Sequence, residues 1–312
     1  MKVSDILKAR NRLQEIVNFS HHNAVFEEYF QTLHSAFLDF GFLRDHYEIE
    51  VQHKANAWRG ATNAIEKDLE QAIARCNQLI EQAEQPLLRR SREVYATMLH
   101  NESDHIILDK ELPVADKLYD SVFTRVGSYS NWQYPALMIR PARETIVERL
   151  VASDPLYIMD QRLSLLVPTL EKFTPEYQRR VRQYCVDEGA RVFAQFPDKT
   201  FNLILAWNFF NYRPMDLVCQ YITEAWDKLR PGGIMGFTFN DCEYVAATIL
   251  AETDFACYTP GRLILDHVTR TGYEIVAHDT DRSRFHWLEI RKPGTLSSLR
   301  GGQCLAKIMP KY

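Results

Sequence analysis

The chain has 312 residues, of which 46% are apolar and 25% are charged, and its formal net charge is −4. This length allows one large domain or two ordinary ones, and the apolar content is sufficient for a packed core. The acidic balance excludes a general electrostatic attraction to nucleic acid, since the few short basic clusters are typical of solvated helix faces.

The six cysteines are scattered and include no Cys-x-x-Cys pair, which argues against a disulfide scaffold and against a zinc ribbon. They are typical of a reducing compartment. The N-terminus mixes charges into its apolar positions, and no run of about 18 apolar residues occurs, so we expect no export signal and no membrane span. The expected location is cytoplasmic, or within a particle that is assembled in the cytoplasm.

Residues 1–110 contain one proline and two glycines, and their apolar residues recur at helical spacing, which predicts a helical domain. An aromatic stripe expected to pack in the core consists of Phe26, Phe30, Leu33 and Phe37. A later stripe, with alternating spacings of four and three, indicates the seam of a coiled coil or long helical hairpin that Pro86 interrupts. Its residues are Ile65, Leu69, Ala72, Cys76, Leu79 and Ala83.

This seam needs a partner helix, which can come from the same chain or from another subunit. We therefore expect a homo-oligomer or a larger protein assembly built through the N-terminal helices. Two Glu-x-x-His spacings, Glu50 with His53 and Glu102 with His105, have the form used by helical di-metal sites. The second pair lies in a turn-like segment and bridging carboxylates cannot be placed, so no metal site is predicted.

From about residue 130, short β-rich runs alternate with helical segments, which predicts a parallel sheet covered on both faces. The expected strands are 136–139, 156–159, 183–186, 201–207 and 234–239. A helix over 260–271 follows, and the runs 273–278 and 284–291 are joined by a short polar turn. These last two runs predict an antiparallel hairpin that closes the sheet.

Two segments carry a resemblance to a known family. FNLILAWNFFNY, residues 201–212, resembles the fourth strand and following turn of class I S-adenosylmethionine-dependent methyltransferases. KLRPGGIMGFTF, residues 228–239, resembles the helix end, Pro-Gly-Gly turn and fifth strand of the same family. In this interpretation Pro231 stops the helix, and the two glycines supply backbone angles that let the chain re-enter the sheet sharply.

The resemblance implies an α/β fold with a seven-stranded, methyltransferase-like (Rossmann-like) sheet, preceded by an α-helical, partly coiled-coil domain. The expected organisation is a helical domain over 1–110, a linker over 111–130, a methyltransferase-like domain over 131–294 and a C-terminal tail over 295–312. The tail is apolar enough to dock on a partner or a neighbouring subunit.

The resemblance also implies a site for S-adenosylmethionine. Asp160, at the end of the second expected strand, matches the acidic residue that holds the ribose hydroxyls, and it lies 20 residues beyond Arg140. An N-cap of the following helix is the alternative role for Asp160. Asp187, after the third strand, matches the position that contacts adenine, and Trp207 is expected to form a wall of the site.

The first loop departs from the family pattern, in which an acidic residue is followed by three alternating glycines. The aligned residues here are Met138, Arg140, Ala142 and Glu144. Glycines at such positions allow positive φ and a close approach of the backbone to the cofactor. Three explanations stay open: Arg140 and Arg143 turn outward and leave a usable site, they bind a different anionic ligand, or the pocket is closed and the domain inactive.

Methyl transfer is an in-line displacement that depends mainly on how the acceptor is positioned. Three polar residues at the end of the fourth strand are the candidate catalytic residues: Asn208, Asn211 and Tyr212. Three more after the fifth strand are expected at the same cleft: Asp241, Cys242 and Tyr244. Neither Asn-Pro-Pro-Tyr nor Pro-Cys occurs, which disfavours methylation of DNA bases. A small-molecule or protein acceptor is compatible with the sequence.

Two functions follow from these residues. The first is a methyltransferase-like protein that uses S-adenosylmethionine, with an acceptor that the sequence does not identify. The alternative is a catalytically inactive protein of the same fold with a structural or assembly role, for example in a virion or another large complex. Fold alone does not decide between them.

Overall fold

The computed structural model describes residues 2–21, 44–100, 116–141, 145–171, 173–188, 191–281 and 286–295. The chain divides into two compact units, Met1–Gln85 and Pro86–Tyr312. Some expectations concern residues whose backbone or side chains lie outside this description: Phe26, Phe30, Leu33, Phe37, Glu50, His53, Ile65, Glu102, His105, Ala142, Arg143, Glu144 and the tail over 296–312.

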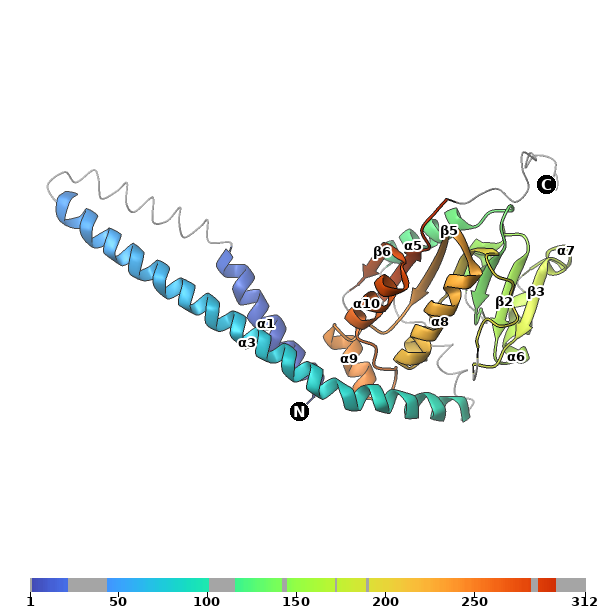
Figure 1. Cartoon of the computed structure of the whole chain (residues 1–312), viewed down its shortest axis with the longest axis horizontal. Helices are drawn as coiled ribbons and strands as arrows, with labels where there is room; N and C mark the ends of the chain where they lie inside the picture. Colours follow the sequence, from blue (N-terminus) through green and yellow to red (C-terminus); the bar gives the residue numbers. More distant parts are fainter. Residues whose placement is uncertain are drawn as a thin grey trace. The chain divides into compact units, whose positions relative to one another are not determined.

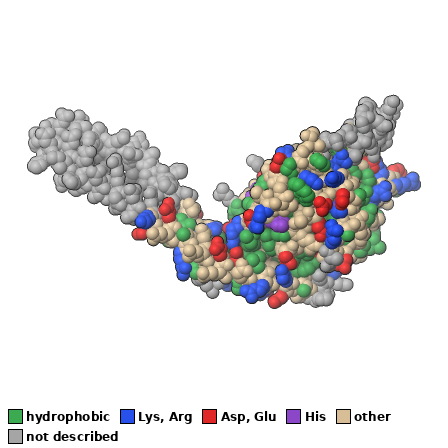
Figure 2. Space-filling view, viewed as in Figure 1, with side chains coloured by type: hydrophobic (Ala, Val, Ile, Leu, Met, Phe, Trp, Pro, Cys, Tyr) green, Lys and Arg blue, Asp and Glu red, His purple; other side chains and the backbone are tan. Residues whose placement is uncertain are grey.

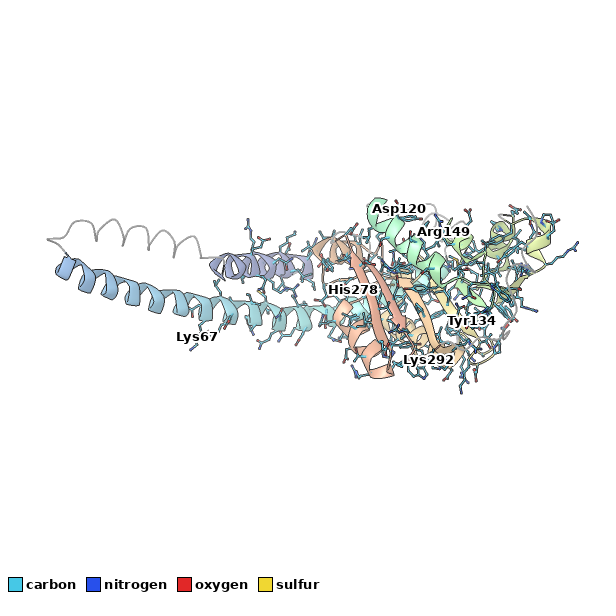
Figure 3. The ribbon with its side chains drawn as sticks, turned by 90° about the horizontal axis from the view of Figure 1, so that it is seen from above. Lys67, Asp120, Tyr134, Arg149, His278 and Lys292 are labelled. Atoms are coloured by element: carbon cyan, nitrogen blue, oxygen red, sulfur yellow. The ribbon has the colours of Figure 1, made fainter. Side chains whose placement is uncertain are left out.

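The first unit is helical, as its apolar spacing predicts. It contains α1 (Val3–His21) and the first part of α3 (Arg44–His100), which run side by side (Figures 1 and 3). The described seam residues are all half-buried: Leu69, Ala72, Cys76, Leu79 and Ala83. Ile80 and Glu84 on the same stretch are buried. The coiled coil stays a prediction.

The division between the units differs from the expected boundary near residue 110. Pro86 lies inside α3 without ending it, and the helix from Pro86 to His100 belongs to the second unit. The segment 111–130 is also more than a linker, because it contains α5 (Asp116–Tyr129). Val122 and Val126 of α5 are buried in a core shared with the sheet.

The second unit is built around a seven-stranded sheet within the described residues. Its strands are β1 (Ala136–Ile139), β2 (Leu156–Asp160), β3 (Val181–Cys185), β4 (Phe201–Ala206), β5 (Leu229–Thr238), β6 (Glu274–Thr280) and β7 (His286–Arg291). Their order is β3-β2-β1-β4-β5-β7-β6 (Figure 1). The pairs from β3 to β5 are parallel, whereas β7 is antiparallel to β5 and to β6. The predicted sheet and closing hairpin are confirmed.

Side chains alternate along the central strands and pack into a separate core on each face. On one face Leu137 and Ile139 of β1 pack with α8 (Met215–Lys228) and α10 (Gly261–Thr271). On the other face Met138 packs with α5 and with η1 (Thr145–Leu150). Burial on both faces explains why these strands are continuous apolar runs. The other short helices are α6 (Leu163–Leu170), α7 (Pro175–Gln178), η2 (Phe210–Tyr212) and α9 (Val245–Glu252).

The Pro-Gly-Gly segment lies inside β5 rather than at a helix end. Helix α8 ends at Lys228 and β5 begins at the next residue, so Pro231 does not stop the helix. The register between β4 and β5 shifts here, and Gly232 has φ 79°, in the left-handed region that favours glycine. A Cβ on Gly233 would lie 2.9 Å from the Phe201 carbonyl oxygen, so the close approach of these strands requires glycine.

No described helix is long and apolar enough to cross a membrane. Acidic and basic side chains are interspersed over the described part of the second unit in the view of Figure 2. On this face, therefore, no extended field of one sign forms, which agrees with the small net charge of the whole chain.

Candidate functional site

The carboxyl ends of β1, β2 and β4 meet at one edge of the sheet, where ligands bind in parallel α/β folds. Arg140 follows β1, Asp160 ends β2, and Asn208 comes just after β4. The register pairs the last residue of β1 with Met159 and with Ala206. The topology therefore brings together the three segments that the sequence assigns to the site.

Arg140 occupies the turn in which the family pattern has its first glycine. Its backbone has φ 46°, and its amide donates a hydrogen bond to the Met159 carbonyl oxygen at 2.7 Å. The side chain turns inward and is 3% exposed, with Nε 3.3 Å from Asp160 Oδ2. Its guanidinium carbon lies 5.2 Å from the centre of the Phe209 ring. Arg140 is thus directed into the protein, toward the acidic residue of β2.

Both carboxylate oxygens of Asp160 have partners. Oδ2 faces Arg140, and Oδ1 accepts a hydrogen bond from the Arg162 backbone amide at 3.0 Å. Burial raises the pKa of Asp160, and the neighbouring Arg140 opposes that shift. The alternative role as a helix N-cap is wrong, because the N-cap residue of α6 is Arg162.

These residues, as arranged, do not fit S-adenosylmethionine. The cofactor would need the Asp160 carboxylate to accept hydrogen bonds from its ribose hydroxyls. The Asp160 side chain is 0% exposed and is paired with Arg140. Arg140 would have to leave Asp160 before a ribose could reach the carboxylate.

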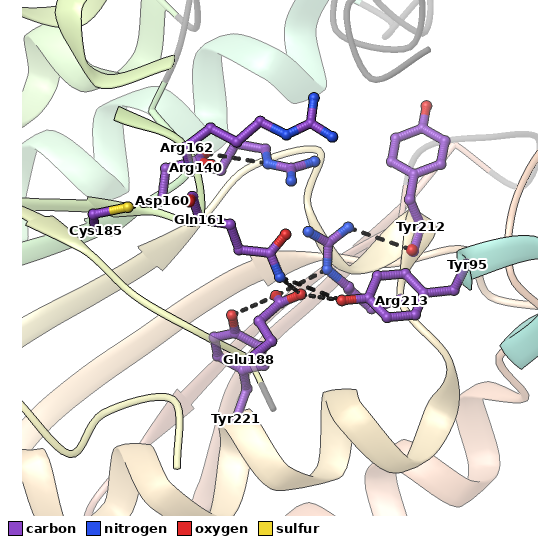
Figure 4. A network of polar contacts seen from close by, with 10 residues as sticks. All are labelled: Tyr95, Arg140, Asp160, Gln161, Arg162, Cys185, Glu188, Tyr212, Arg213 and Tyr221. Carbon is purple, nitrogen blue, oxygen red and sulfur yellow. Dashed lines mark hydrogen bonds and ion pairs between the residues drawn. The ribbon is translucent and has the colours of Figure 1, made fainter. Parts of the chain in front are cut away.

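A second buried ion pair lies beside the first. Arg213 Nε donates to Glu188 Oε1 at 3.0 Å, and both side chains are almost completely buried. The Arg213 guanidinium also lies over the Phe209 ring, 4.2 Å from its centre, so the same ring contacts both Arg140 and Arg213. The two ion pairs therefore lie next to the same aromatic ring, and Figure 4 shows their four charged side chains.

Glu188 is the centre of a hydrogen-bond network (Figure 4). It accepts from the Tyr221 hydroxyl at 2.6 Å, and it also accepts from Tyr95 and Gln161. Burial alone would raise the pKa of Glu188, but Arg213 and the hydrogen bonds that its carboxylate accepts outweigh burial and lower it. The carboxylate is thus held in its charged form inside the protein.

Helix α3 supplies part of this network from its last turns. Tyr95 reaches Glu188 from α3, and its ring lies 5.0 Å from the Arg213 guanidinium carbon. One turn earlier, Ser91 Oγ accepts a hydrogen bond from the Tyr258 amide at 2.7 Å. The C-terminal part of α3 therefore belongs structurally to the site and to the sheet domain.

Two residues predicted to contact the cofactor differ in burial, and their contact with a cofactor stays a prediction. Trp207 is buried in the core on the α5 face, with ring-centre distances of 5.6 Å to Phe123 and 5.5 Å to Trp287. Asp187 is exposed, whereas the next residue, Glu188, is the acidic side chain that enters the buried cluster. Packing in the core explains the position of Trp207, since a large aromatic ring stabilises the fold most when it is buried.

The three candidate catalytic residues lie together after β4, in and beside η2. Asn208 has φ 49°, and its amide donates to Thr238 Oγ1 at 2.7 Å. Asn211 is buried, and among the described residues its Oδ1 has no hydrogen-bond partner. Tyr212 is buried, with its ring centre 6.5 Å from that of Phe255. The structure places them at the expected edge of the sheet, and their catalytic role stays a prediction.

Of the residues after β5, Asp241 and Cys242 are buried and Tyr244 is half-buried. Burial raises the pKa of Asp241 to about 6, although its Oδ1 accepts hydrogen bonds from the Glu243 and Gly261 amides. Cys242 is buried in an environment that raises the pKa of its thiol. Tyr244 stacks on His286 with ring centres 4.7 Å apart. No described group of three or more His, Cys, Asp or Glu side chains could hold a metal ion.

Comparison with known proteins gives no sequence relative: no protein-family model matches this chain, and no curated protein matches it. Solved structures do resemble it. A possible exported protein from Bordetella parapertussis has 14% identity and a TM-score of 0.47, over 60% of this chain and 72% of that one. A putative methyltransferase from Bacillus halodurans has 10% identity and a TM-score of 0.46, over 57% and 100% of the two chains.

The N-methyltransferase NodS from Bradyrhizobium japonicum, solved with S-adenosyl-L-homocysteine, has 15% identity and a TM-score of 0.43, over 65% of this chain and 98% of NodS. Identities of 10–15% and TM-scores of 0.43–0.47 give no information about the function of this chain. The strand order, with β7 antiparallel between β5 and β6, is that of the class I methyltransferase fold. The predicted fold class is therefore confirmed, as a methyltransferase-like α/β domain that follows a helical region.

Proposed function

We propose that this chain is a methyltransferase-fold protein that does not transfer methyl groups and serves as a component of a protein assembly. The Arg140 to Asp160 ion pair carries this proposal. Arg140 stands where the fold's cofactor loop has a glycine, and its side chain covers the carboxylate that would hold the ribose. The Arg140 side chain thus occupies the position from which a ribose would contact the Asp160 carboxylate.

The energetic argument concerns the displacement of Arg140. Separating one partner from a buried ion pair costs about 3–5 kcal/mol, because a charge is left buried without compensation. This cost would weaken binding of S-adenosylmethionine by roughly two to nearly four orders of magnitude. A dissociation constant of about 1 μM would then rise to roughly 0.1–4 mM.

Calorimetric titration of the full chain with S-adenosylmethionine and S-adenosylhomocysteine tests this proposal. We expect no binding heat with the wild type. The Arg140→Gly variant restores glycine at a residue with positive φ and uncovers Asp160, so it is expected to gain measurable affinity. Micromolar binding by the wild type that Asp160→Ala abolishes would refute the proposal.

The assembly role is supported by the helical unit. Five residues of one stripe on α3 are only half-buried, so part of their surface is available to another helix. Light scattering at micromolar concentration tests this part: a stable homo-oligomer or co-purifying complex is expected. A monomer that co-purifies with no other protein would contradict it.

Methyl transfer is the second candidate function, and one observation favours it. Asn208 adopts φ 49° just after β4, and strained residues cluster at functional sites. In this alternative Asn208, Asn211 and Tyr212 would position a small-molecule or protein acceptor. The titration described above separates the two candidates, because only this one requires the cofactor to bind the wild type.

A further inference from the structure

We propose that the last turns of α3, residues 86–97, form a releasable strap that closes the carboxyl edge of the sheet. In the closed form, which the structure shows, the strap contributes Tyr95 to the polar network around Glu188. In the open form the strap leaves that network while the sheet domain stays folded. The inference goes beyond the proposed function, because the strap covers this edge through contacts that do not involve Arg140.

The strap lies where open α/β sheets bind their ligands, beyond the carboxyl ends of the parallel strands. The Tyr95 hydroxyl donates to Glu188, which follows β3, and accepts from Gln161, which follows β2. The Arg213 guanidinium carbon lies 5.0 Å from the centre of the Tyr95 ring and 4.2 Å from that of Phe209. Figure 4 shows Tyr95 entering this network from its helix. This part of the edge is therefore covered while the strap is docked.

The strap is held by polar contacts rather than by buried apolar side chains. Among residues 86–97, Ser91 is the only buried residue, and the others are half-buried or exposed. By comparison, α5 places Val122, Phe123 and Val126 in the core. Burial of apolar surface is the dominant stabilising contribution, so an element without it can open at a lower free energy than the whole domain unfolds.

Two further contacts of the strap are exposed ion pairs. Arg90 pairs with Asp254, and Arg92 Nη2 lies 3.2 Å from Asp216 Oδ2. The four side chains are between 39% and 67% exposed. Ion pairs of this kind contribute little to stability, because water and salt screen them. They orient the strap without fixing it strongly.

Release of the strap does not break the buried ion pair of the network. Glu188 and Arg213 both lie outside α3, and Glu188 also accepts hydrogen bonds from Tyr221 and Gln161. On opening, the carboxylate loses the Tyr95 donor and keeps the others. The large cost of leaving a buried charge without its partner therefore does not oppose the opening.

The chain contains its own reporter for this motion. Cys257 is completely buried, and its Sγ donates to the Ser91 carbonyl oxygen of the strap at 3.6 Å. Cys242 is also buried, but its Sγ contacts Asn240 and Thr259, which lie outside the strap. Release of the strap is expected to uncover Cys257 and to leave Cys242 covered, whereas global unfolding exposes both thiols.

The experiment is alkylation of the full, reduced chain with iodoacetamide at about pH 8, where a free thiol reacts as its thiolate. Peptide mass spectrometry gives the rate at each cysteine, and the exposed Cys185 checks the activity of the reagent. Rates proportional to the reagent concentration report opening equilibria. We expect Cys257 to react at least about tenfold faster than Cys242. The Cys257 rate should also rise less steeply with urea, because releasing the strap exposes less surface than unfolding.

A pair of variants tests whether α3 itself moves. Tyr95→Phe removes the hydroxyl that donates to Glu188 and keeps the ring, so it should raise the Cys257 rate by about fivefold or more. An opening confined to the loop around Cys257 would keep the Tyr95 contact and would not respond to this change. Thr97→Ala is the matched control, because Thr97 is exposed and its hydroxyl donates to Glu93 within the same helix. It should leave the Cys257 rate unchanged.

A Cys257 rate no higher than that of Cys242 would overturn the inference, because both thiols would then be exposed only by global unfolding. A Cys257 rate that Tyr95→Phe leaves unchanged, or that Thr97→Ala raises equally, would overturn it as well. Near-ultraviolet circular dichroism checks that both variants are folded. The experiment does not use S-adenosylmethionine, so its failure would leave the proposed function standing, and failure of the cofactor titration would leave the strap standing.

Discussion

Replacing Glu188 with glutamine tests how far the buried network stabilises the second unit. Glu188 accepts hydrogen bonds from Arg213 at 3.0 Å and from Tyr221 at 2.6 Å. Tyr95 and Gln161 donate to the same carboxylate. Glutamine keeps the volume but removes the negative charge, which leaves the Arg213 guanidinium buried without its counter-charge. Removing one partner of a buried pair costs about 3–5 kcal/mol. Because glutamine can keep some of these hydrogen bonds, we expect a loss near 3 kcal/mol.

Urea unfolding followed by tryptophan fluorescence measures this loss, since Trp207 and Trp287 are buried in the second unit. The pKa of Glu188 is lowered from its ordinary value of 4.5, so its stabilising contribution is present above pH 4.5 and is lost as the pH falls below it. The difference between variant and wild type should therefore shrink on acidification. Glu93→Gln, at an exposed position of α3, is the control and should stay within about 0.5 kcal/mol of the wild type. A loss below about 1 kcal/mol for Glu188→Gln at pH 7 would refute the reasoning.

Three further outcomes are expected. Gly261→Ala should lower the free energy of unfolding by about 1–3 kcal/mol, because its Cβ would lie 2.6 Å from Asp241 Cγ; an unchanged urea midpoint would contradict this. Burial raises the pKa of Asp241 from 3.8 to about 6, so its ionisation opposes folding increasingly from about pH 4 and fully above about pH 6. Asp241→Asn should therefore raise the free energy of unfolding at pH 7 by roughly 2–3 kcal/mol, and with it the melting temperature. This gain should disappear below about pH 4. Ser91→Ala should cost about 1–3 kcal/mol in urea unfolding, because the Tyr258 amide loses its acceptor, whereas the exposed Thr97→Ala should change little.

The strands could be predicted from the sequence because their signals are local. β1 and β4 are short apolar runs that stay buried on both faces, and the sequence pattern already contains this information. Asp160 could be located for the same reason, since a polar residue directly after a buried strand marks its carboxyl end. α5 was equally accessible in principle, because Leu118, Val122 and Val126 recur at intervals of four.

The network around Glu188 could not be predicted, because its members are far apart in the chain. Tyr95 and Glu188 are separated by 93 residues, and only the docking of α3 brings them together. No periodic pattern distinguishes Glu188 from its exposed neighbour Asp187, since both lie in the irregular loop after β3. The inward turn of Arg140 is likewise a tertiary effect that depends on Asp160 and Phe209.

Helix α3 has a consequence for how the chain can be cut. A fragment that starts at residue 131, where the methyltransferase-like part begins in sequence, would lack Ser91 and Tyr95. The Tyr258 amide would then be left without its acceptor, and Glu188 without one of its donors. The smallest piece expected to fold by itself therefore begins near Pro86, at the start of the compact unit. Boundaries for gene fusions and domain exchange should therefore lie before Pro86, and limited proteolysis should leave the chain after Pro86 intact. The reason is that the last turns of α3, which starts at Arg44, belong to the sheet domain.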